Sequence, residues 1–388
     1  MRLTVARERV ALDGAMAPLE PPLDLTEWAD DLARLHDFAL RDAQAAGVDA
    51  AYLADLGGRL FRRVFVGEVL AVYRDALAAG PFSLGLSAAG SLAALPWELL
   101  YDPQARHYLG AAGPVTLFRR GEGALAPAPT PVTPTRLLLV FAPPGDPPVY
   151  APSEVVAMVR EALGPALADG RVVLDYELSG TVSALNDRLN DPTTRPHLVH
   201  FFGHGDVREE DGQGALGFAD DAGVHHPLGG ERLRGLFAGK GVQGVLLTAC
   251  RSGQVTGAAD PLAMAAQAIL RAGVPAVVAQ QFVARVETTH RFFARLYAAL
   301  SDGDPLERAA AFGRHALWVE TPPGDDNPLG FAVPVCYLAA ERGPRLGAAP
   351  AETPAPPPEP PGLAKVETVP PTFTGRERDV RRVEAAWR

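Results

Sequence analysis

Two apolar runs in this chain each end at a side chain that can take part in nucleophilic chemistry. One run ends at His204, which is followed by Gly205, and the other ends at Cys250. A thiolate attacks carbonyl carbons, and an imidazole within hydrogen-bonding distance can take the thiol proton and later give it to the leaving amine. If the two runs are adjacent parallel strands, both side chains reach one edge of a sheet. The pair predicts a cysteine endopeptidase that acts through a thioester acyl-enzyme.

The small residues around the pair suit the same chemistry. Gly205 lets the backbone approach a substrate without a side chain in the way. We expect its N–H and that of Cys250 to bind the oxyanion of a tetrahedral intermediate, an effect of about 3–4 kcal/mol per donor. No third member of a triad stands out. The carboxylates of Asp206 and Asp260 are candidates for attracting a basic residue of the substrate.

The elements that must position these residues alternate regularly between strand and helix. We expect strands at residues 135–142, 172–178, 197–202, 242–248 and 276–281, and helices at residues 152–163, 182–189, 261–272 and 287–300. This alternation predicts an α/β fold with three layers and a mainly parallel central sheet. Functional sites in such sheets lie at the carboxyl ends of the strands, where both His204 and Cys250 fall. Residues 206–230 and 253–260 are expected to be the loops that flank the pair.

Composition narrows the class of protein. The 388 residues carry a net charge of −10, which argues against a general binder of nucleic acids or anionic membranes. With two cysteines a disulfide framework is not expected, and a reducing compartment is favoured. The charged N-terminus does not read as a signal peptide, and no apolar run is long enough to span a bilayer. We therefore expect a cytoplasmic protein. No acidic or cysteine ligand has the spacing of a metal site, and we expect neither a metal nor a cofactor.

Five motifs, in order, resemble the CHAT family of cysteine peptidases in the caspase and separase clan. They are LPWELLYDP at 95–103, HFFGHG at 200–205, TACRSG at 248–253, AGVPAVV at 272–278 and NPLGFA at 327–332. The resemblance implies a caspase-like sandwich over residues 135–345, with His204 as general base and Cys250 as nucleophile. It also implies that residues 1–123 form a smaller α/β companion domain, similar to a degenerate protease domain and joined by a Pro/Ala-rich linker at 124–134. Where relatives carry an acidic or Trp-rich element after the fifth strand, this chain has Gln280, a further candidate for the substrate pocket.

The C-terminal residues resemble the entry segment of signalling NTPases of the STAND or AAA type. A Pro-rich stretch at 346–371 is followed by FTGRERDVRRVEAAW at 373–387. This resemblance implies a protease effector tethered to an NTPase module that continues beyond residue 388, in a bacterial signalling or immunity system. The expected partners are thus a protein or peptide substrate and that module.

Several residues and two other functions must be weighed against the peptidase interpretation. We expect Cys336 to be a core residue, His200 to be a hydrogen-bonded structural histidine in a strand, and His225 and His226 to be a solvated pair in a hairpin-like loop. A catalytically silent interaction module would keep the fold without the reaction. A thiol-dependent acyltransferase would use the same nucleophile, base and oxyanion hole, and only transfer to an added amine would separate it from a peptidase.

Overall fold

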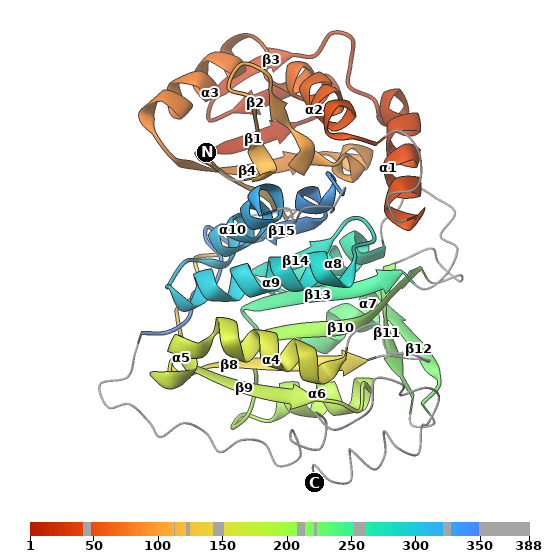
Figure 1. Cartoon of the computed structure of the whole chain (residues 1–388), viewed down its shortest axis with the longest axis vertical. Coiled ribbons are helices and arrows are strands. Elements are labelled where there is room, and N and C mark those ends of the chain that lie inside the picture. The colour runs from red at the N-terminus through yellow and green to blue at the C-terminus, as the bar shows by residue number, and fades with distance from the viewer. Residues whose placement is uncertain are drawn as a thin grey trace.

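The structure of the chain is a large sheet with helices packed on both of its faces (Figure 1). The computed structural model describes residues 1–41, 48–111, 113–121, 125–142, 151–207, 214–220, 223–251, 261–320 and 327–348. Within these ranges no helix is both long and apolar enough to cross a lipid bilayer.

Of the strands in the described residues, thirteen share the main sheet, and β5 and β6 form a separate hairpin. The strands are β1 (Arg2–Val5), β2 (Arg9–Leu12), β3 (Ala15–Pro18), β4 (Phe82–Ala88), β5 (Tyr101–Asp102), β6 (His107–Tyr108), β7 (Val115–Arg120), β8 (Thr135–Ala142), β9 (Val172–Glu177), β10 (Leu198–Val207), β11 (Gly214–Ala219), β12 (His225–Gly229), β13 (Gly244–Arg251), β14 (Ala276–Gln280) and β15 (Pro334–Leu338).

The α-helices are α1 (Ala29–Arg41), α2 (Ala50–Val64), α3 (Gly67–Ala79), α4 (Pro152–Ala162), α5 (Gly164–Ala168), α6 (Val182–Asn190), α7 (Gly230–Phe237), α8 (Pro261–Arg271), α9 (Val286–Ser301) and α10 (Leu306–Val319). Short 3-10 helices join them, namely η1 (Leu25–Trp28), η2 (Gly90–Ala94), η3 (Trp97–Leu99), η4 (Leu109–Ala111) and η5 (Gly330–Ala332).

The centre of the sheet is a block of parallel strands in the order β9-β8-β10-β13-β14. Parallel strands need crossover connections, and helices α4, α6, α7 and α8 lie in the connections between these strands. The sequences of these strands are continuous apolar runs because helices cover both faces of the sheet. In β13, for example, Val245, Leu246 and Leu247 are all fully buried. The expected α/β class with a large, mainly parallel sheet is confirmed.

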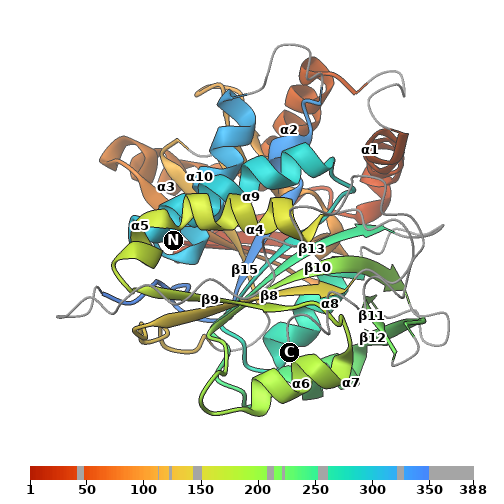
Figure 2. The same ribbon diagram turned by 60° about the horizontal axis from the view of Figure 1, so that its bottom comes forward.

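Helices cover the two faces of this central block in separate layers (Figure 2). Residues of α4 and α9 pack in one hydrophobic cluster with Phe202 and Leu246. Residues of α6, α7 and α8 pack in a second cluster with Phe201 and Val245. Successive residues of a strand point to opposite faces, so even-numbered positions of β10 and β13 belong to the α4/α9 face.

The N-terminal part of the chain extends the same sheet instead of forming a second one. Strand β15 runs antiparallel to β14 and pairs in parallel with β7, and the sheet continues through β4 to β1, β2 and β3. The stretch 125–134 lies between β7 and β8, and Ala126 bridges to Ala340 just after β15. The division into a companion domain at 1–123 and a catalytic domain at 135–345 stays a prediction.

The structure corrects the expected loop at 206–230. Strand β10 continues to Val207, and the hairpin of β11 and β12 occupies much of that stretch. His225 and His226 therefore lie in a strand, where they pair with Ala219 and Phe218. The sheet extends here because β11 offers β10 a new antiparallel partner beyond the end of β8.

Candidate active site

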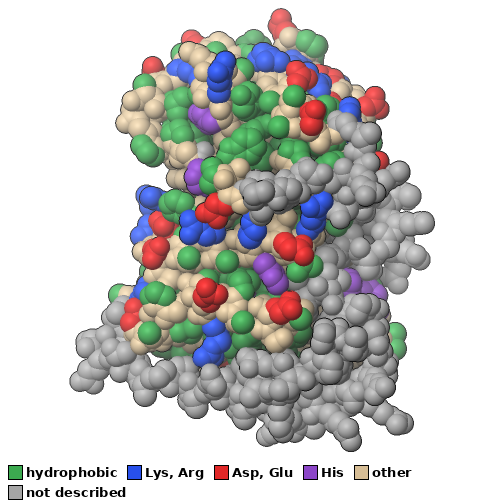
Figure 3. Space-filling model, in the orientation of Figure 1, with side chains coloured by type: hydrophobic (Ala, Val, Ile, Leu, Met, Phe, Trp, Pro, Cys, Tyr) green, Lys and Arg blue, Asp and Glu red, His purple; other side chains and the backbone are tan. Residues whose placement is uncertain are grey.

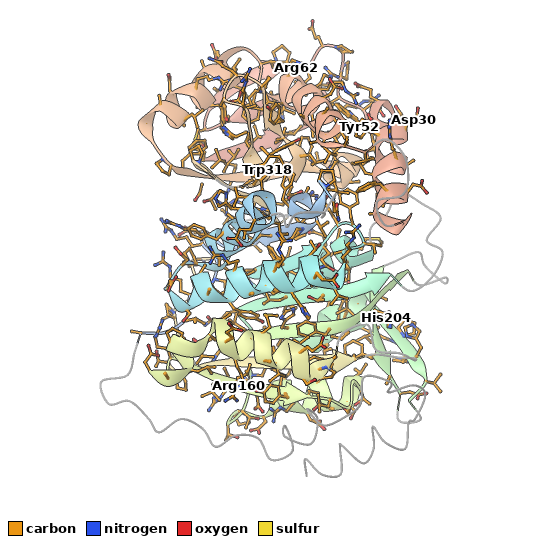
Figure 4. The ribbon with its side chains drawn as sticks, in the orientation of Figure 1. Asp30, Tyr52, Arg62, Arg160, His204 and Trp318 are labelled. Carbon is orange, nitrogen blue, oxygen red and sulfur yellow. The ribbon has the colours of Figure 1, made fainter. Side chains whose placement is uncertain are left out.

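Strands β10 and β13 bring His204 and Cys250 to partner positions at the carboxyl edge of the sheet. The parallel register starts with Leu198 opposite Gly244, places His204 opposite Cys250 and ends with Gly205 opposite Arg251. Partners in a ladder share the same phase of the pleat, so both positions belong to the α4/α9 face. The side chain of Cys250 lies outside the described part of the structure, whereas His204 is half-buried near the end of β10 (Figure 4).

His204 also marks the point where β10 changes partners. Up to Gly203, β10 pairs in parallel with β8, and from His204 onward it pairs with β11 in antiparallel. A Cβ atom on Gly203 would lie 2.6 Å from the Phe201 ring and 2.7 Å from the Ala142 carbonyl oxygen. Only glycine fits so close an approach, and the absent side chain lets β8 end against β10 just before the histidine.

His225 is a neighbour of His204 that the sequence did not reveal. It pairs with Ala219 across the β11–β12 ladder, but its ring covers Gly217. A Cβ atom on Gly217 would lie 2.6 Å from His225 Cε1 and 3.3 Å from His204 Cβ. The glycine thus creates the space in which the exposed His225 ring lies beside the catalytic candidate. In the sequence, the only sign of this neighbour is Gly217 and Ala219 in one segment and His225 and His226 in the next. The pairing of the two segments could not be known without the structure.

His200 lies four residues before His204 in β10, on the same face of the sheet, and is completely buried. Its Nδ1 is 2.7 Å from the hydroxyl of Tyr297, and its Nε2 is 2.9 Å from Oγ1 of Thr248. Burial lowers the pKa of His200 well below its usual value, which keeps the imidazole neutral. The expectation of a hydrogen-bonded structural histidine is confirmed.

Of the other predicted site residues, Gly205 is described by the structure, whereas the side chains of Asp206 and Asp260 are not. Gly205 is buried and pairs with Arg251, one position beyond the His204–Cys250 pair. Asp206 lies in β10 opposite Ala215, and its side chain is outside the described part, as is the whole of Asp260. The roles of these residues stay predictions.

Gln280 ends β14 and is buried, and it donates a hydrogen bond from Nε2 to Oγ1 of Thr289 at 3.0 Å. Its assignment to the substrate pocket also stays a prediction. One amide N–H of Gln280 is thus engaged by Thr289 of α9 in this structure.

A buried ionic cluster next to β14 was not foreseen. Glu98, in the LPWELLYDP motif, is fully buried and accepts a hydrogen bond from Arg119 Nε at 3.0 Å. Gln281 joins both groups: its Nε2 is 2.9 Å from Glu98 Oε2, and its Oε1 is 2.8 Å from Arg119 Nη2. The cluster ties the N-terminal part of the chain to the carboxyl end of β14.

Other reactive groups do not add to the site. Cys336 is fully buried in β15, as expected of a core residue, and burial raises the pKa of its thiol well above the usual value. Within the described residues, no group of three or more His, Cys, Asp or Glu side chains could hold a metal ion. The arrangement can therefore supply an imidazole, a thiol and the backbone N–H groups at the ends of two strands.

The CHAT domain profile matches residues 34–355, which is most of the chain. The chain belongs to the CHAT domain family. A search of curated protein sequences found no match.

Solved structures with a related course of the chain include a separase–securin complex and a cysteine proteinase. The crystal structure of the Saccharomyces cerevisiae separase–securin complex aligns with 68% of this CHAT chain and 16% of the separase chain, at 14% identity and a TM-score of 0.40. The Arg-specific cysteine proteinase gingipain R aligns with 83% of this chain and 77% of its own, at 12% identity and a TM-score of 0.46. This chain thus spans about a sixth of the separase chain.

Proposed function

We propose that this CHAT protein is a cysteine endopeptidase whose nucleophile is Cys250 and whose general base is His204. The observation that carries the proposal is the register of β10 and β13, which pairs these two positions at the carboxyl edge of the sheet. The family match supports the same reaction class.

The proposed reaction uses the two side chains and two backbone groups. His204 takes the proton of the Cys250 thiol, and the thiolate attacks the carbonyl carbon of the peptide bond. The backbone N–H groups of Gly205 and Cys250 donate to the oxyanion. The His204 imidazolium then protonates the leaving amine, and the acyl group remains on sulfur as a thioester. His204 next takes a proton from water, whose oxygen attacks the thioester and releases the acid and the free thiol.

The finer parts of the proposal concern the substrate. Protein or peptide chains are the proposed substrates, with Asp206, Asp260 and Gln280 as candidate pocket residues. A carboxylate in the pocket would favour a basic residue before the cleaved bond.

The remaining part of the proposal concerns regulation. We place the catalytic unit at residues 135–345 beside a companion domain at 1–123. In a longer cytoplasmic protein, the tether at 346–371 and the segment 372–388 would lead into an NTPase module. This layout suits an effector of regulated proteolysis in bacterial defence.

The experiment is a cleavage assay on a peptide library derived from a proteome, analysed by mass spectrometry. Wild-type protein should produce cleavage products that are missing with Cys250→Ala and that persist with Cys336→Ala. Addition of an amine acceptor separates hydrolysis from acyl transfer, because transfer would place the amine on the new C-terminus. Equal products from wild type and Cys250→Ala would refute the assignment of the nucleophile.

A further inference from the structure

A buried polar chain crosses from helix α9 to the two strands that carry the candidate catalytic pair. The side chains of Tyr297, His200 and Thr248 form it, and all three are fully buried. Tyr297 comes from α9, His200 from β10 and Thr248 from β13. These three side chains therefore link one helix and two strands through hydrogen bonds between side chains.

The position of this chain relative to the pair follows from the pleat. His200 lies four residues before His204, and Thr248 lies two residues before Cys250. Residues two or four apart in a strand share a face, so the bond from His200 to Thr248 lies on the same face as the pair. It links β10 to β13 directly below the strand ends.

The surroundings of His200 hold its ring in one place. The ring centroid is 3.9 Å from that of Phe202 and 4.2 Å from that of Phe293. Each ring nitrogen has one hydroxyl partner, at 2.7 Å for Tyr297 and 2.9 Å for Thr248. Both the packing and the hydrogen bonds fix the position of the imidazole. Because this ring links β10 to β13, they also restrict movement of these two strands relative to each other.

With a neutral imidazole, the protons of these three side chains can be arranged in either of two directions. A neutral imidazole has one N–H, so the three groups carry three donors for two hydrogen bonds. Within the described residues, the hydroxyls of Tyr297 and Thr248 bond only to His200. When Tyr297 donates to Nδ1, the imidazole N–H donates to Thr248, and the remaining hydroxyl proton is at the end of the chain nearer Cys250.

We propose that His200 is a positioning residue of the catalytic site, which through Thr248 and Tyr297 fixes the spacing of β10 and β13 beneath His204 and Cys250. The inference rests on the proposed function, since these three hydrogen-bonded side chains are proposed to align the catalytic pair. A purely structural chain would stabilise the core without any influence on the reactivity of Cys250.

The test measures how fast iodoacetamide alkylates Cys250 across a range of pH, with peptide mapping to locate the label. Alkylation requires the thiolate, so its pH midpoint reports the thiol pKa without any substrate. The buried Cys336 should stay unlabelled in the folded protein, which controls for unfolding.

Thr248→Val removes the hydroxyl and keeps the shape of the side chain. We expect the midpoint to rise toward the free-cysteine value of about 8.5, and the rate at pH 7 to fall about tenfold, a change of the size that the loss of one hydrogen bond produces. Tyr297→Phe should shift the midpoint in the same direction by less. Thr248→Ser should restore the wild-type profile, because it keeps the hydroxyl.

Thr135→Val is the matched control. Thr135 is nearly as buried as Thr248, and its Oγ1 donates to the Val132 carbonyl at 2.8 Å and accepts from the Gly347 N–H at 3.1 Å, but it lies at the amino end of β8. This variant should lower the melting temperature to a similar degree and leave the alkylation profile unchanged.

One result would contradict the positioning role alone, and a different result would contradict the proposed function as well. If Thr248→Val and Tyr297→Phe lose stability like Thr135→Val but keep the wild-type profile, the chain is structural and the inference is wrong. If the wild-type Cys250 already titrates as a free cysteine and no peptide is cleaved, the proposed function fails, and the inference fails with it.

Discussion

At the scale of single residues, complete burial decides how His200 behaves. The ring lies in an apolar part of the core, and burial lowers its pKa, to which the nearby His290 adds a smaller effect in the same direction. A protonated imidazole there would lack a carboxylate partner among the described residues within hydrogen-bonding distance. His200 therefore stays neutral in the folded protein over the range in which an exposed histidine titrates.

This burial predicts a dependence of stability on pH. The unfolded chain takes up a proton at His200 below about pH 6.5, and the folded protein does not until a lower pH. The free energy of unfolding should therefore fall as the pH drops below 6.5, by up to about 1.4 kcal/mol per pH unit for this residue, until its folded-state pKa is reached. The measurement is urea unfolding between pH 7 and 5.

His200→Gln should flatten that slope, because glutamine does not titrate. The matched control is His226→Gln, which replaces an exposed histidine of β12. An unchanged slope in His200→Gln would show that His200 is not the source of the pH dependence.

Among the elements, the end of β14 is held in place by a motif from another part of the chain. The η3 segment places Trp97 and Glu98 in the core, and the indole of Trp97 donates to the Leu92 carbonyl at 2.9 Å. Glu98 then pairs with Arg119 of β7 and with Gln281 just after β14. The N-terminal part of the sheet thus supports the carboxyl edge at which the candidate pair lies.

Glu98→Gln tests the contribution of this cluster. The substitution keeps the shape of the side chain but leaves the Arg119 guanidinium buried without its counter-charge, and we expect a loss of about 3–5 kcal/mol in the free energy of unfolding. The double variant Glu98→Gln/Arg119→Met should recover part of this loss, since it removes the unpaired charge as well.

The control for that experiment is the Asp304–Arg308 pair beside the start of α10, in which Arg308 is exposed and Asp304 is half-buried. Asp304→Asn should change the free energy of unfolding by less than about 1 kcal/mol. If Glu98→Gln is as mild as Asp304→Asn, the cluster does not stabilise the junction.

Across the whole molecule, strands with continuous apolar runs could be predicted from the sequence, and pairings set by distant segments could not. The prediction at 135–142 coincides with β8, whereas β10 continues five residues past its predicted end because β11 replaces β8 as its partner. The pair His204–Cys250 could be inferred since both residues end apolar runs in a parallel block. The Glu98 cluster could not, because its partners Arg119 and Gln281 lie 21 and 183 residues away.

The described surface of the face shown in Figure 3 carries charges of both signs. On the face covered by α4 and α9, side chains of both signs are interspersed with apolar ones over the described surface (Figure 3). The net charge of −10 therefore does not form a single acidic field on that face. Recognition of a substrate is then expected to depend on the residues near the strand ends more than on long-range attraction.

The most direct test of the central claim compares the alkylation profile of Cys250 in the wild type and in His204→Ala. If the register of β10 and β13 makes the two residues a working pair, the imidazolium lowers the thiol pKa, and the wild-type cysteine reacts at a pH well below about 8.5. His204→Ala should move the midpoint up to about 8.5, while His226→Ala leaves it in place. Identical profiles for the wild type and His204→Ala would contradict the pair, and with it the proposed mechanism.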